Sequence, residues 1–445
     1  MNTIKITEFF KTDYVDHASY DNLRKIASYI DGCKNTSRKI LYTVIDKNIT
    51  QEIKVDQLSN KMAEHTQYLH GGAQGVIVTM AQNYVGTNNL PLLTREGNFG
   101  TRFSPEASAP RYIYTTKEKY LNSLFLKQDN DILISQEFEG DKIEPRFFVP
   151  TLPLLLINGS EGISSGFAQK ILGRNIKDIK NYIQNSITGS KKRVDLTPYF
   201  EGFCGAVEQG EKQNQWNIKG IIKRKSITQI EITELPVGYT LTSYIKVLDE
   251  LEDKKVIRSY KDFSDNDKFN FVVIMDSKEL KVLSDSELLD KLKLIKRVAE
   301  NYTSIDEDNK IRQFSSPKDI LEAFIKIRLK FIEARKVNMI EKITSDMKLN
   351  VSKYMFVKSI IDGKLTINNK NKTEIVTQLE GLDRIITVEG TYDYLLRMPV
   401  YSLTKDKMEE LKEYIQKLKT DLEKTKETSV AEMWVNDIIE LEKNI

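Results

Sequence analysis

Apolar residues recur three and four positions apart along the first part of the chain. This spacing predicts helices over four segments, at residues 21–31, 37–46, 55–65 and 72–85. The connections between them are short, and the turn Asp31-Gly-Cys-Lys-Asn-Thr36 contains a glycine. Short helices joined by tight turns are typical of a helix-turn-helix unit, with the segment from Pro91 to Tyr114 following as a wing. The pattern alone leaves this as one interpretation among several.

The pattern changes at Gly159. Residues 158–166 are dense in glycine and are expected to form a loop. Apolar and polar residues then alternate in ways that predict strands at residues 199–203, 229–234 and 269–275. The middle of the chain is therefore expected to be a mixed α and β region. It carries a basic group that either contacts nucleic acid or is a solvated strand face: Lys219, Lys223, Arg224 and Lys225.

A long helical stretch is predicted from Pro317 onwards. Its apolar residues alternate four and three positions apart, with Lys336 as the one exception: Ile325, Leu329, Ile332, Met339 and Ile343. A second run has the same spacing: Met408, Leu411, Ile415, Leu418 and Leu422. Two such runs separated by a compact helical insert predict an antiparallel coiled coil capped by that insert.

Composition narrows the class of protein. A chain of 445 residues is long enough for two or three domains, and a net charge of +3 excludes a uniform polycation, so any nucleic-acid surface must be local. Cys33 and Cys204 are the only cysteines, and no apolar run is long enough to span a bilayer. We therefore expect a soluble protein of a reducing compartment, the cytoplasm.

One stretch, from Arg95 to Thr115, gathers most of the candidate chemistry. Gly97 and Gly100 are expected to let backbone approach a ligand closely. Pro110 blocks a helix, so Arg111 and Tyr112 are expected on an exposed strand or loop. A phenol is a weak nucleophile, and cationic neighbours favour its ionised form and stabilise charge on an attacked phosphate. Arg111 and Tyr112 alone do not exclude a tyrosine that merely packs.

Basic residues crowd the first part of the chain, as a solvated surface or as a phosphate-binding surface: Arg24, Lys25, Lys34, Arg38, Lys39, Arg95, Arg102 and Arg111. His70 has no second ligand at metal spacing, which argues against zinc. Asp129-Asn-Asp131 and Glu139-Gly-Asp141 lack a strand–helix–strand context, so we interpret them as a variable surface loop and not as a magnesium site.

Several motifs together resemble one family. These are Asn98-Phe-Gly-Thr-Arg102 followed by Ala109-Pro-Arg-Tyr112, the element from Asp31 to Tyr42, and the glycine-dense segment that contains Ile163. They are similar to the breakage-reunion part of the type IIA DNA topoisomerases, and more to that of the eukaryotic enzyme than to gyrase. Cys33 and Asn35 depart from the family pattern, and Leu69 stands where a second histidine is usual. The resemblance extends over essentially the whole chain.

The resemblance implies a multidomain α+β fold. A winged-helix (helix-turn-helix) DNA-binding and cleavage domain would occupy residues 1–158, and a mixed α/β tower residues 159–310. Residues 311–445 would form a long antiparallel coiled coil with a helical exit-gate dimerisation domain, inserted at about residues 346–404.

The resemblance also implies roles for individual residues. Tyr112 would attack a DNA phosphate and form a transient 5′-phosphotyrosyl bond, and Arg111, His70 and Arg24 would stabilise the transition state. Ile163 would wedge between base pairs, although it would ordinarily plug a small core under its loop. The remaining implied DNA contacts are basic: Lys34, Arg38, Lys39, Arg95 and Arg102.

No metal ligand is expected in this chain. Mg²⁺ and ATP are implied on a partner, the ATPase/Toprim large subunit or subunits, and the chain is expected to be inactive without it. Homodimers would form through the cleavage domain and the exit gate. No segment resembles a DNA-wrapping domain, so relaxation and decatenation are expected instead of supercoiling.

Two other classes of protein share some of these features. A non-catalytic coiled-coil DNA-bridging protein would also have basic helices and heptads. A tyrosine recombinase also uses Tyr, Arg and His, but it links to the 3′ end of DNA and needs more arginine–histidine pairs than this chain offers.

Overall fold

The computed structural model describes residues 5–190 and 192–445 and divides the chain into two compact units. The first unit runs to Lys127 and continues over residues 133–328 and 437–445. The second comprises residues 128–132 and 329–436. The expected division into three domains stays a prediction.

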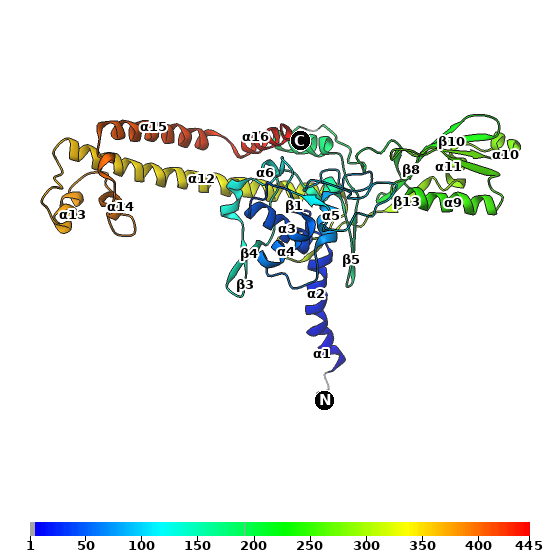
Figure 1. Cartoon of the computed structure of the whole chain (residues 1–445), viewed down its shortest axis with the longest axis horizontal. Coiled ribbons are helices and arrows are strands. Elements are labelled where there is room, and N and C mark those ends of the chain that lie inside the picture. The colour runs from blue at the N-terminus through cyan, green and yellow to red at the C-terminus, as the bar shows by residue number, and fades with distance from the viewer. Residues whose placement is uncertain (1–4, 191) are drawn as a thin grey trace. The chain divides into compact units, whose positions relative to one another are not determined.

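The first unit begins with five helices, α1 (Ile6–Lys11), α2 (Asp13–Lys25), α3 (Asn35–Asp46), α4 (Val55–His65) and α5 (Gln74–Ala81). Figure 1 shows α1 and α2 following each other in the blue segment at the N-terminus. The helices predicted at residues 37–46 and 55–65 are confirmed. The one predicted at residues 72–85 is shorter, because the backbone becomes extended at Gln82, whose side chain donates a hydrogen bond of 2.8 Å to the Phe99 carbonyl.

The helix predicted at residues 21–31 is wrong in its second half. α2 ends at Lys25, and Ile26 already has extended geometry. The Ala27 N–H donates to Gln169 Oε1 at 3.0 Å, and Ser28 forms a parallel bridge with Ile305. The segment from Ile26 to Ile30 is mostly apolar because it is buried between distant parts of the chain. Its apolar residues therefore resemble a helical pattern although the segment is not a helix.

The segment predicted as a wing is mostly irregular. The short strands β1 (Ile53–Lys54) and β2 (Tyr114–Thr115) pair antiparallel, and two isolated bridges join Leu93 to Lys117 and Glu96 to Tyr114. The helix α6 (Leu121–Leu124) follows. These contacts attach the end of the segment to the beginning of α4.

Two hairpins come next, β3 (Ser135–Phe138) with β4 (Asp141–Pro145), and β5 (Ser160–Ser164) with β6 (Phe167–Ile171). The short helix α7 (Leu154–Asn158) precedes the second hairpin. The loop predicted at residues 158–166 is therefore wrong, because most of it is the strand β5. In this hairpin Ile163 pairs with Ala168.

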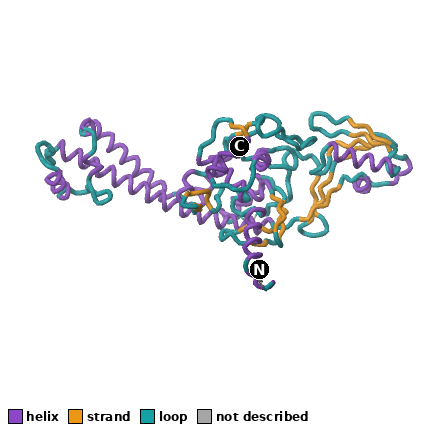
Figure 2. The backbone as a smooth tube through the Cα atoms, turned by 60° about the horizontal axis from the view of Figure 1, so that its bottom comes forward, coloured by secondary structure: helices purple, strands orange, loops and turns teal. Residues whose placement is uncertain are grey.

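After α8 (Ile176–Thr188) the first unit contains two larger antiparallel sheets. A three-stranded sheet has the order β13–β8–β7, with bounds Ile295–Ala299, Gln215–Lys219 and Ala206–Gln209. A four-stranded sheet has the order β11–β12–β10–β9, with bounds Ser259–Asp262, Phe271–Ile274, Gln229–Glu234 and Ile221–Arg224. Figure 2 shows these strands in orange. Strands β14 (Thr303–Ile305) and β15 (Ile311–Gln313) form a separate pair.

A hydrophobic core covers one face of the four-stranded sheet. It contains Ile230, Ile232, Phe271 and Val273 of the sheet together with residues of α9 (Leu241–Asp253), α10 (Ser277–Val282) and α11 (Asp285–Lys291). The strands predicted at residues 229–234 and 269–275 are confirmed. The strand predicted at residues 199–203 is wrong, because this segment is a turn that buries Phe200.

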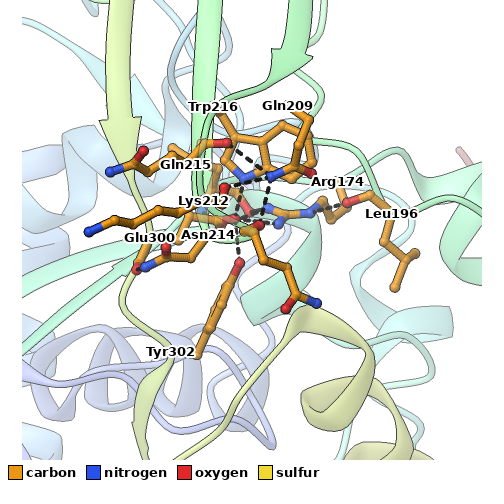
Figure 3. Close-up of polar contacts among 11 residues, drawn as sticks. Arg174, Leu196, Gln209, Lys212, Asn214, Gln215, Trp216, Glu300 and Tyr302 are labelled. Atoms are coloured by element: carbon orange, nitrogen blue, oxygen red, sulfur yellow. Dashed lines mark hydrogen bonds and ion pairs between the residues drawn. The ribbon is translucent and has the colours of Figure 1, made fainter.

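A buried polar network stabilises the edge of the three-stranded sheet (Figure 3). Glu300, which is 3% exposed, accepts hydrogen bonds from Arg174, Trp216 and Tyr302. Each of these three bonds is 2.7 to 2.8 Å long, and Arg174 is fully buried. Since every charge in it is paired, this network joins segments far apart in the sequence without leaving an uncompensated ion.

The second unit consists of helices. The long helix α12 (Pro317–Ile361) enters it at Leu329, and α15 (Lys405–Glu427) runs antiparallel beside it. Tyr414 donates a hydrogen bond to Asp346, and Lys336 donates to the carbonyls of Lys426 and Thr428, both at 2.7 Å. The exceptional Lys336 in the apolar run therefore binds carbonyl groups at the C-terminus of α15.

A small helical insert lies between these two helices, with α13 (Lys372–Glu380), α14 (Asp393–Leu396) and the 3₁₀-helix Val400–Ser402. It has its own hydrophobic core around Phe356, Leu379 and Leu395. The helix α16 (Val430–Glu442) ends the chain. None of the helices among the described residues combines the length and the apolar character needed to cross a membrane.

Candidate active site

Arg111 and Tyr112 lie on a turn that the N-terminus of α4 holds in place. The Val55 N–H donates to the Ile113 carbonyl at 3.1 Å, and the Asp56 N–H donates to the Pro110 carbonyl at 3.3 Å. Ile113 is 1% exposed, so it anchors the turn in the core. The Tyr112 N–H closes the turn on the Ala109 carbonyl at 2.9 Å. The position expected for Arg111 and Tyr112, an exposed loop, is confirmed.

The Tyr112 side chain is directed into solvent, with 68% of its surface exposed. The Arg111 guanidinium carbon lies 5.2 Å from the centre of the Tyr112 ring. A large aromatic residue gains nothing from burial at such a position, so packing does not explain Tyr112. An oxygen accessible to a macromolecule, with a cation beside it, suits attack on a phosphate.

Gly97 and Gly100 have a reason within the loop itself, and the close approach to a ligand expected from the sequence stays a prediction. Both have positive φ, +101° and +85°. A Cβ atom at Gly97 would lie 3.0 Å from Ile113 Cγ2, and one at Gly100 would lie 2.3 Å from the Pro105 carbonyl oxygen. The glycines therefore let the loop fold tightly behind Ile113 and so fix the turn that carries Tyr112.

Arg24 and His70 form a second group, with Tyr20 between them. Tyr20 and Arg24 occupy successive turns of α2, and the Arg24 guanidinium carbon lies 5.6 Å from the centre of the Tyr20 ring. The Tyr20 hydroxyl is hydrogen-bonded to His70 Nε2, and His70 is on the loop between α4 and α5. The sequence analysis did not single out Tyr20.

Lys34 and Ile163 form a third group at the β5–β6 hairpin. Lys34 Nζ donates to the Glu161 carbonyl at 2.6 Å, two residues before Ile163. Burial lowers the pKa of the Lys34 ammonium, although the Glu161 carboxylate acts in the opposite direction. Ile163 is 75% exposed, which excludes the alternative that it plugs a core beneath its loop.

The hairpin itself is attached to α2. The Ser165 N–H donates to Asp21 Oδ2 at 2.9 Å, and the Ser164 hydroxyl donates to Asn22 Oδ1 at 2.5 Å. A Cβ atom at Gly162 would lie 2.1 Å from the Lys25 carbonyl oxygen, so this contact requires glycine. The helix that carries Tyr20 and Arg24 therefore also supports Ile163.

Three of the predicted phosphate-binding residues are buried and paired within the chain. Arg38 binds the Asp31 carboxylate at 2.7 Å, Lys39 binds Glu144 at 2.9 Å, and Arg102 binds Glu234 at 2.7 Å. All three side chains are at most about a tenth exposed. This geometry favours a structural role for them over direct phosphate contact. Arg95, by contrast, is exposed.

Tyr112 stays separate from Arg24 and His70 within the described part of one copy of the chain. Over residues 5–190 and 192–445, no hydrogen bond, ion pair or ring contact joins Tyr112 to Arg24 or His70. Contacts of Tyr112 with its own chain are limited, in the same residues, to the turn and to Arg111.

The acidic residues singled out in the sequence do not fit a magnesium ion. Asp129, expected on a surface loop, is 3% exposed in the 3₁₀-helix Lys127–Ile132, where it pairs with Arg335 at 3.5 Å. Asp131 pairs with Lys342 at 2.5 Å. Glu139 and Asp141 belong to the β3–β4 hairpin. Within the described residues, no three His, Cys, Asp or Glu side chains converge as metal ligands.

Comparison with known proteins identifies the family of this chain. The family model for the A-type subunit of DNA gyrase/topoisomerase IV matches residues 24–442. The chain belongs to this family, the type IIA topoisomerases, and its described part has the fold of their DNA-binding and cleavage region.

Individual relatives agree with this assignment. The chain is 32% identical to the mitochondrial DNA topoisomerase 2 of Dictyostelium discoideum, over 99% of this chain and 35% of that protein. It is 29% identical to the DNA topoisomerase 2 of Invertebrate iridescent virus 6, over 99% of this chain and 39% of that protein. The chain therefore spans about a third of the length of these relatives.

Among solved structures, the chain is similar to the DNA-binding, cleavage and re-ligation domain of Plasmodium falciparum topoisomerase II. The TM-score is 0.87 at 32% identity, and the match covers 98% of this chain and 64% of that one. The similarity in sequence and in fold thus extends over nearly the whole chain.

Proposed function

We propose that this chain is the subunit that cleaves and rejoins DNA in an ATP-dependent type IIA topoisomerase, with Tyr112 as the nucleophile. The observation that carries the proposal is the exposed Tyr112 ring with the Arg111 guanidinium 5.2 Å from its centre, on a turn anchored by α4, in a chain of this family. Backbone hydrogen bonds from α4 hold the turn in position, as positioned catalysis requires.

The reaction that fits this site is a transesterification. The Tyr112 oxygen attacks a DNA phosphorus atom and loses its proton, while the bond from phosphorus to the 3′ oxygen breaks. The 3′ oxygen leaves as a hydroxyl, and the 5′ end stays on Tyr112 as a phosphodiester. Because one ester replaces another, rejoining is the reverse step and needs no energy source. Arg111, His70 and Arg24 stabilise the negative charge of the transition state.

DNA contact is assigned to three residues that remain accessible. Lys34 and Arg95 provide positive charge for phosphates, and Ile163 wedges between base pairs and bends the duplex. Arg38, Lys39 and Arg102 maintain the surface that presents them, since their charges are already paired inside the protein.

The finer architecture follows from the same assignment. Residues 1–158 are the winged-helix cleavage domain, with helices α3 to α5 in its helix-turn-helix unit and residues 91–114 as the wing. The two larger sheets belong to the tower, residues 159–310. Helices α12 and α15 are the antiparallel coiled coil, and the insert between them is the exit gate through which two copies dimerise. The antiparallel contacts of Lys336 and Tyr414 support this part of the proposal.

The partner of this chain would supply the functions that its described residues do not offer. We assign Mg²⁺ binding and ATP hydrolysis to an ATPase/Toprim large subunit or subunits. Asp129 and Asp131 are paired with cations of their own chain, and no step is assigned to a metal held here. More specifically, we assign the chain to the medium subunit of a T-even-type bacteriophage topoisomerase, in the cytoplasm of the host; a viral topoisomerase 2 among its relatives is compatible with this.

The test is covalent capture of labelled DNA. The chain, reconstituted with its ATPase/Toprim partner and Mg²⁺, should retain radiolabelled DNA through denaturation in detergent, with the 5′ ends blocked. Tyr112→Phe should abolish this attachment and leave DNA affinity unchanged, because only the attacking oxygen is removed.

The matched control is Tyr114→Phe. Tyr114 is also exposed, lies two residues away and has Lys54 6.0 Å from its ring centre, so it tests whether any tyrosine beside a cation suffices. Covalent attachment that persists in Tyr112→Phe would refute the assignment. Blocked 3′ ends would indicate a recombinase, and DNA binding without attachment in the wild-type protein would indicate a bridging protein.

A further inference from the structure

Tyr20 connects two residues of the candidate active site that come from different elements. Its ring lies beside the Arg24 guanidinium, 5.6 Å away, and its hydroxyl is bonded to His70 Nε2. It is 48% exposed, so burial in a core does not explain its position. Leu69, which precedes His70, is 80% exposed and has no hydrogen-bonding atom in its side chain. Tyr20 is therefore the side chain that restrains the His70 ring.

The direction of this hydrogen bond and the tautomer of His70 depend on each other. In a neutral imidazole one ring nitrogen donates and the other accepts, and the partner of one nitrogen fixes the role of the other. A phosphate oxygen can only accept a hydrogen bond. If the Tyr20 hydroxyl donates to Nε2, the proton of neutral His70 is on Nδ1, where it can be donated to a phosphate.

A second aromatic residue near His70 makes a useful contrast. The centre of the Tyr68 ring lies 5.9 Å from the centre of the His70 ring, and the two rings are arranged edge-on. Its hydroxyl, however, is paired with Thr36 Oγ1 at 3.3 Å and not with the histidine. Tyr20 and Tyr68 thus contact the same imidazole, Tyr20 with a hydrogen bond to it and Tyr68 without one.

We propose that Tyr20 is a positioning residue for DNA cleavage: its hydroxyl holds His70 as an Nδ1–H donor, and its ring keeps Arg24 beside that donor. This inference rests on the proposed function, because it assigns His70 and Arg24 to one phosphate. Tyr20 does not itself touch the reacting atoms.

The hydrogen bond is tested on the full chain by NMR with ¹⁵N-labelled histidine. The chain has three histidines, so the His70 signals are identified with a His70→Ala sample. For the neutral imidazole we expect the Nδ1–H form in the wild-type protein. Tyr20→Phe, which keeps the ring beside Arg24, should shift His70 towards the Nε2–H form. Tyr68→Phe should leave it unchanged. A tautomer that is the same in wild type and Tyr20→Phe would overturn the proposal.

The catalytic consequence is measured on the chain reconstituted with its partner and Mg²⁺. Tyr20→Phe should slow cleavage at saturating DNA about tenfold, the effect of one lost hydrogen bond, with an unchanged dissociation constant for DNA. Combined with His70→Ala, it should cause no further loss, because the two residues act together. Fully additive losses, or a change in DNA affinity alone, would overturn the proposal.

The two measurements also separate this inference from the proposed function. Wild-type protein that forms no Tyr112-linked DNA would count against both the function and the catalytic role of Tyr20, whereas the NMR result still decides whether Tyr20 sets the His70 tautomer. Normal cleavage by Tyr20→Phe would refute the role of Tyr20 and leave the function of Tyr112 intact.

Discussion

Ile163 is an apolar side chain that the protein holds in solvent. At 75% exposure it contributes little to the core, and the strand pairing that supports it does not depend on its side chain. Ile163→Ala should therefore leave the melting temperature almost unchanged while it reduces DNA bending and alters the choice of cleavage sites. Thermal melting and a bending assay on the same variant measure both effects.

The control for this variant lies in the same hairpin. Ile171 is 3% exposed, and its replacement by alanine should cost about 2–5 kcal/mol of unfolding free energy. If Ile163→Ala destabilised the protein as much as Ile171→Ala and left bending unaltered, Ile163 would be a packing residue after all.

Single residues differ in how well the sequence predicts their position. Pro110 and two glycines suffice to predict that Arg111 and Tyr112 lie on an exposed strand or loop, because proline restricts the backbone locally and glycine permits turns. The burial of Arg38 and Arg102 depends on Asp31 and Glu234. Arg102 and Glu234 are over a hundred positions apart, and local sequence does not show such pairing. Tyr20 was missed for the same reason, because its partner His70 is 50 positions away.

At the scale of elements, Asp21 attaches the β5–β6 hairpin to α2. Its pKa is held below the ordinary carboxyl value by hydrogen bonds from Lys25 and then from Ser165. A depressed pKa means that the ionised form is stabilised in the folded protein, so the contribution is present above the ordinary value of about 3.9 and is lost as pH falls through the lowered one. We expect the Ser165 amide to lose protection from hydrogen exchange over that acidic range.

Asp21→Asn mimics the protonated acid and should produce the same loss of protection at neutral pH. Asp276→Asn is a control, since Asp276 also has a lowered pKa, caused first by the Lys278 N–H, at the start of α10 in another part of the first unit. Ser165 exchange that is equally protected in Asp21→Asn would show that strand pairing alone holds the hairpin.

The buried network around Glu300 is expected to make a large contribution to the free energy of unfolding. Glu300→Gln places an NH₂ group against donors and leaves the buried Arg174 charge uncompensated, which should cost about 3–5 kcal/mol. Glu208→Gln is the matched control, because the Glu208 side chain is 54% exposed in its pair with Lys219 and such a pair is worth about 0–1 kcal/mol. Chemical denaturation of both variants compares them, and equal stabilities would contradict a structural role for the network.

Elements whose pattern is periodic and local were predicted well. Three of them each bury one face, so their apolar residues recur with a clear period: the helices at residues 37–46 and 55–65 and the strand at residues 229–234. The segment from Ile26 to Ile30 was misassigned because it is buried on several sides by Gln169 and Ile305. When every side of a segment is buried, its apolar residues no longer show whether they follow a helical or a strand period. The β5 strand was hidden by the glycines in and beside it, of which Gly162 is required by its close contact with the Lys25 carbonyl of α2.

At the scale of the whole molecule, the residues assigned to one reaction are distributed over separate groups. Tyr112 has no contact, over the described residues, with the pair of Arg24 and His70. The motifs were sufficient to predict the family that the comparisons show, because they lie in the same order along the chain. How two copies assemble was not predictable in the same physical sense, since it depends on surfaces and not on any local pattern.

Mixed dimers test the assembly directly. One Tyr112 provides one phosphotyrosyl bond, so two strands require two copies of the chain. A dimer of one wild-type and one Tyr112→Phe subunit, reconstituted with the ATPase/Toprim partner, should nick a supercoiled plasmid without linearising it, and strand passage should be lost. A mixed dimer of wild type and Tyr114→Phe should still linearise the plasmid when the reaction is stopped with detergent. Linear product from the Tyr112→Phe mixed dimer would mean that a single tyrosine cuts both strands, and the proposed homodimer would then not be the cleaving unit.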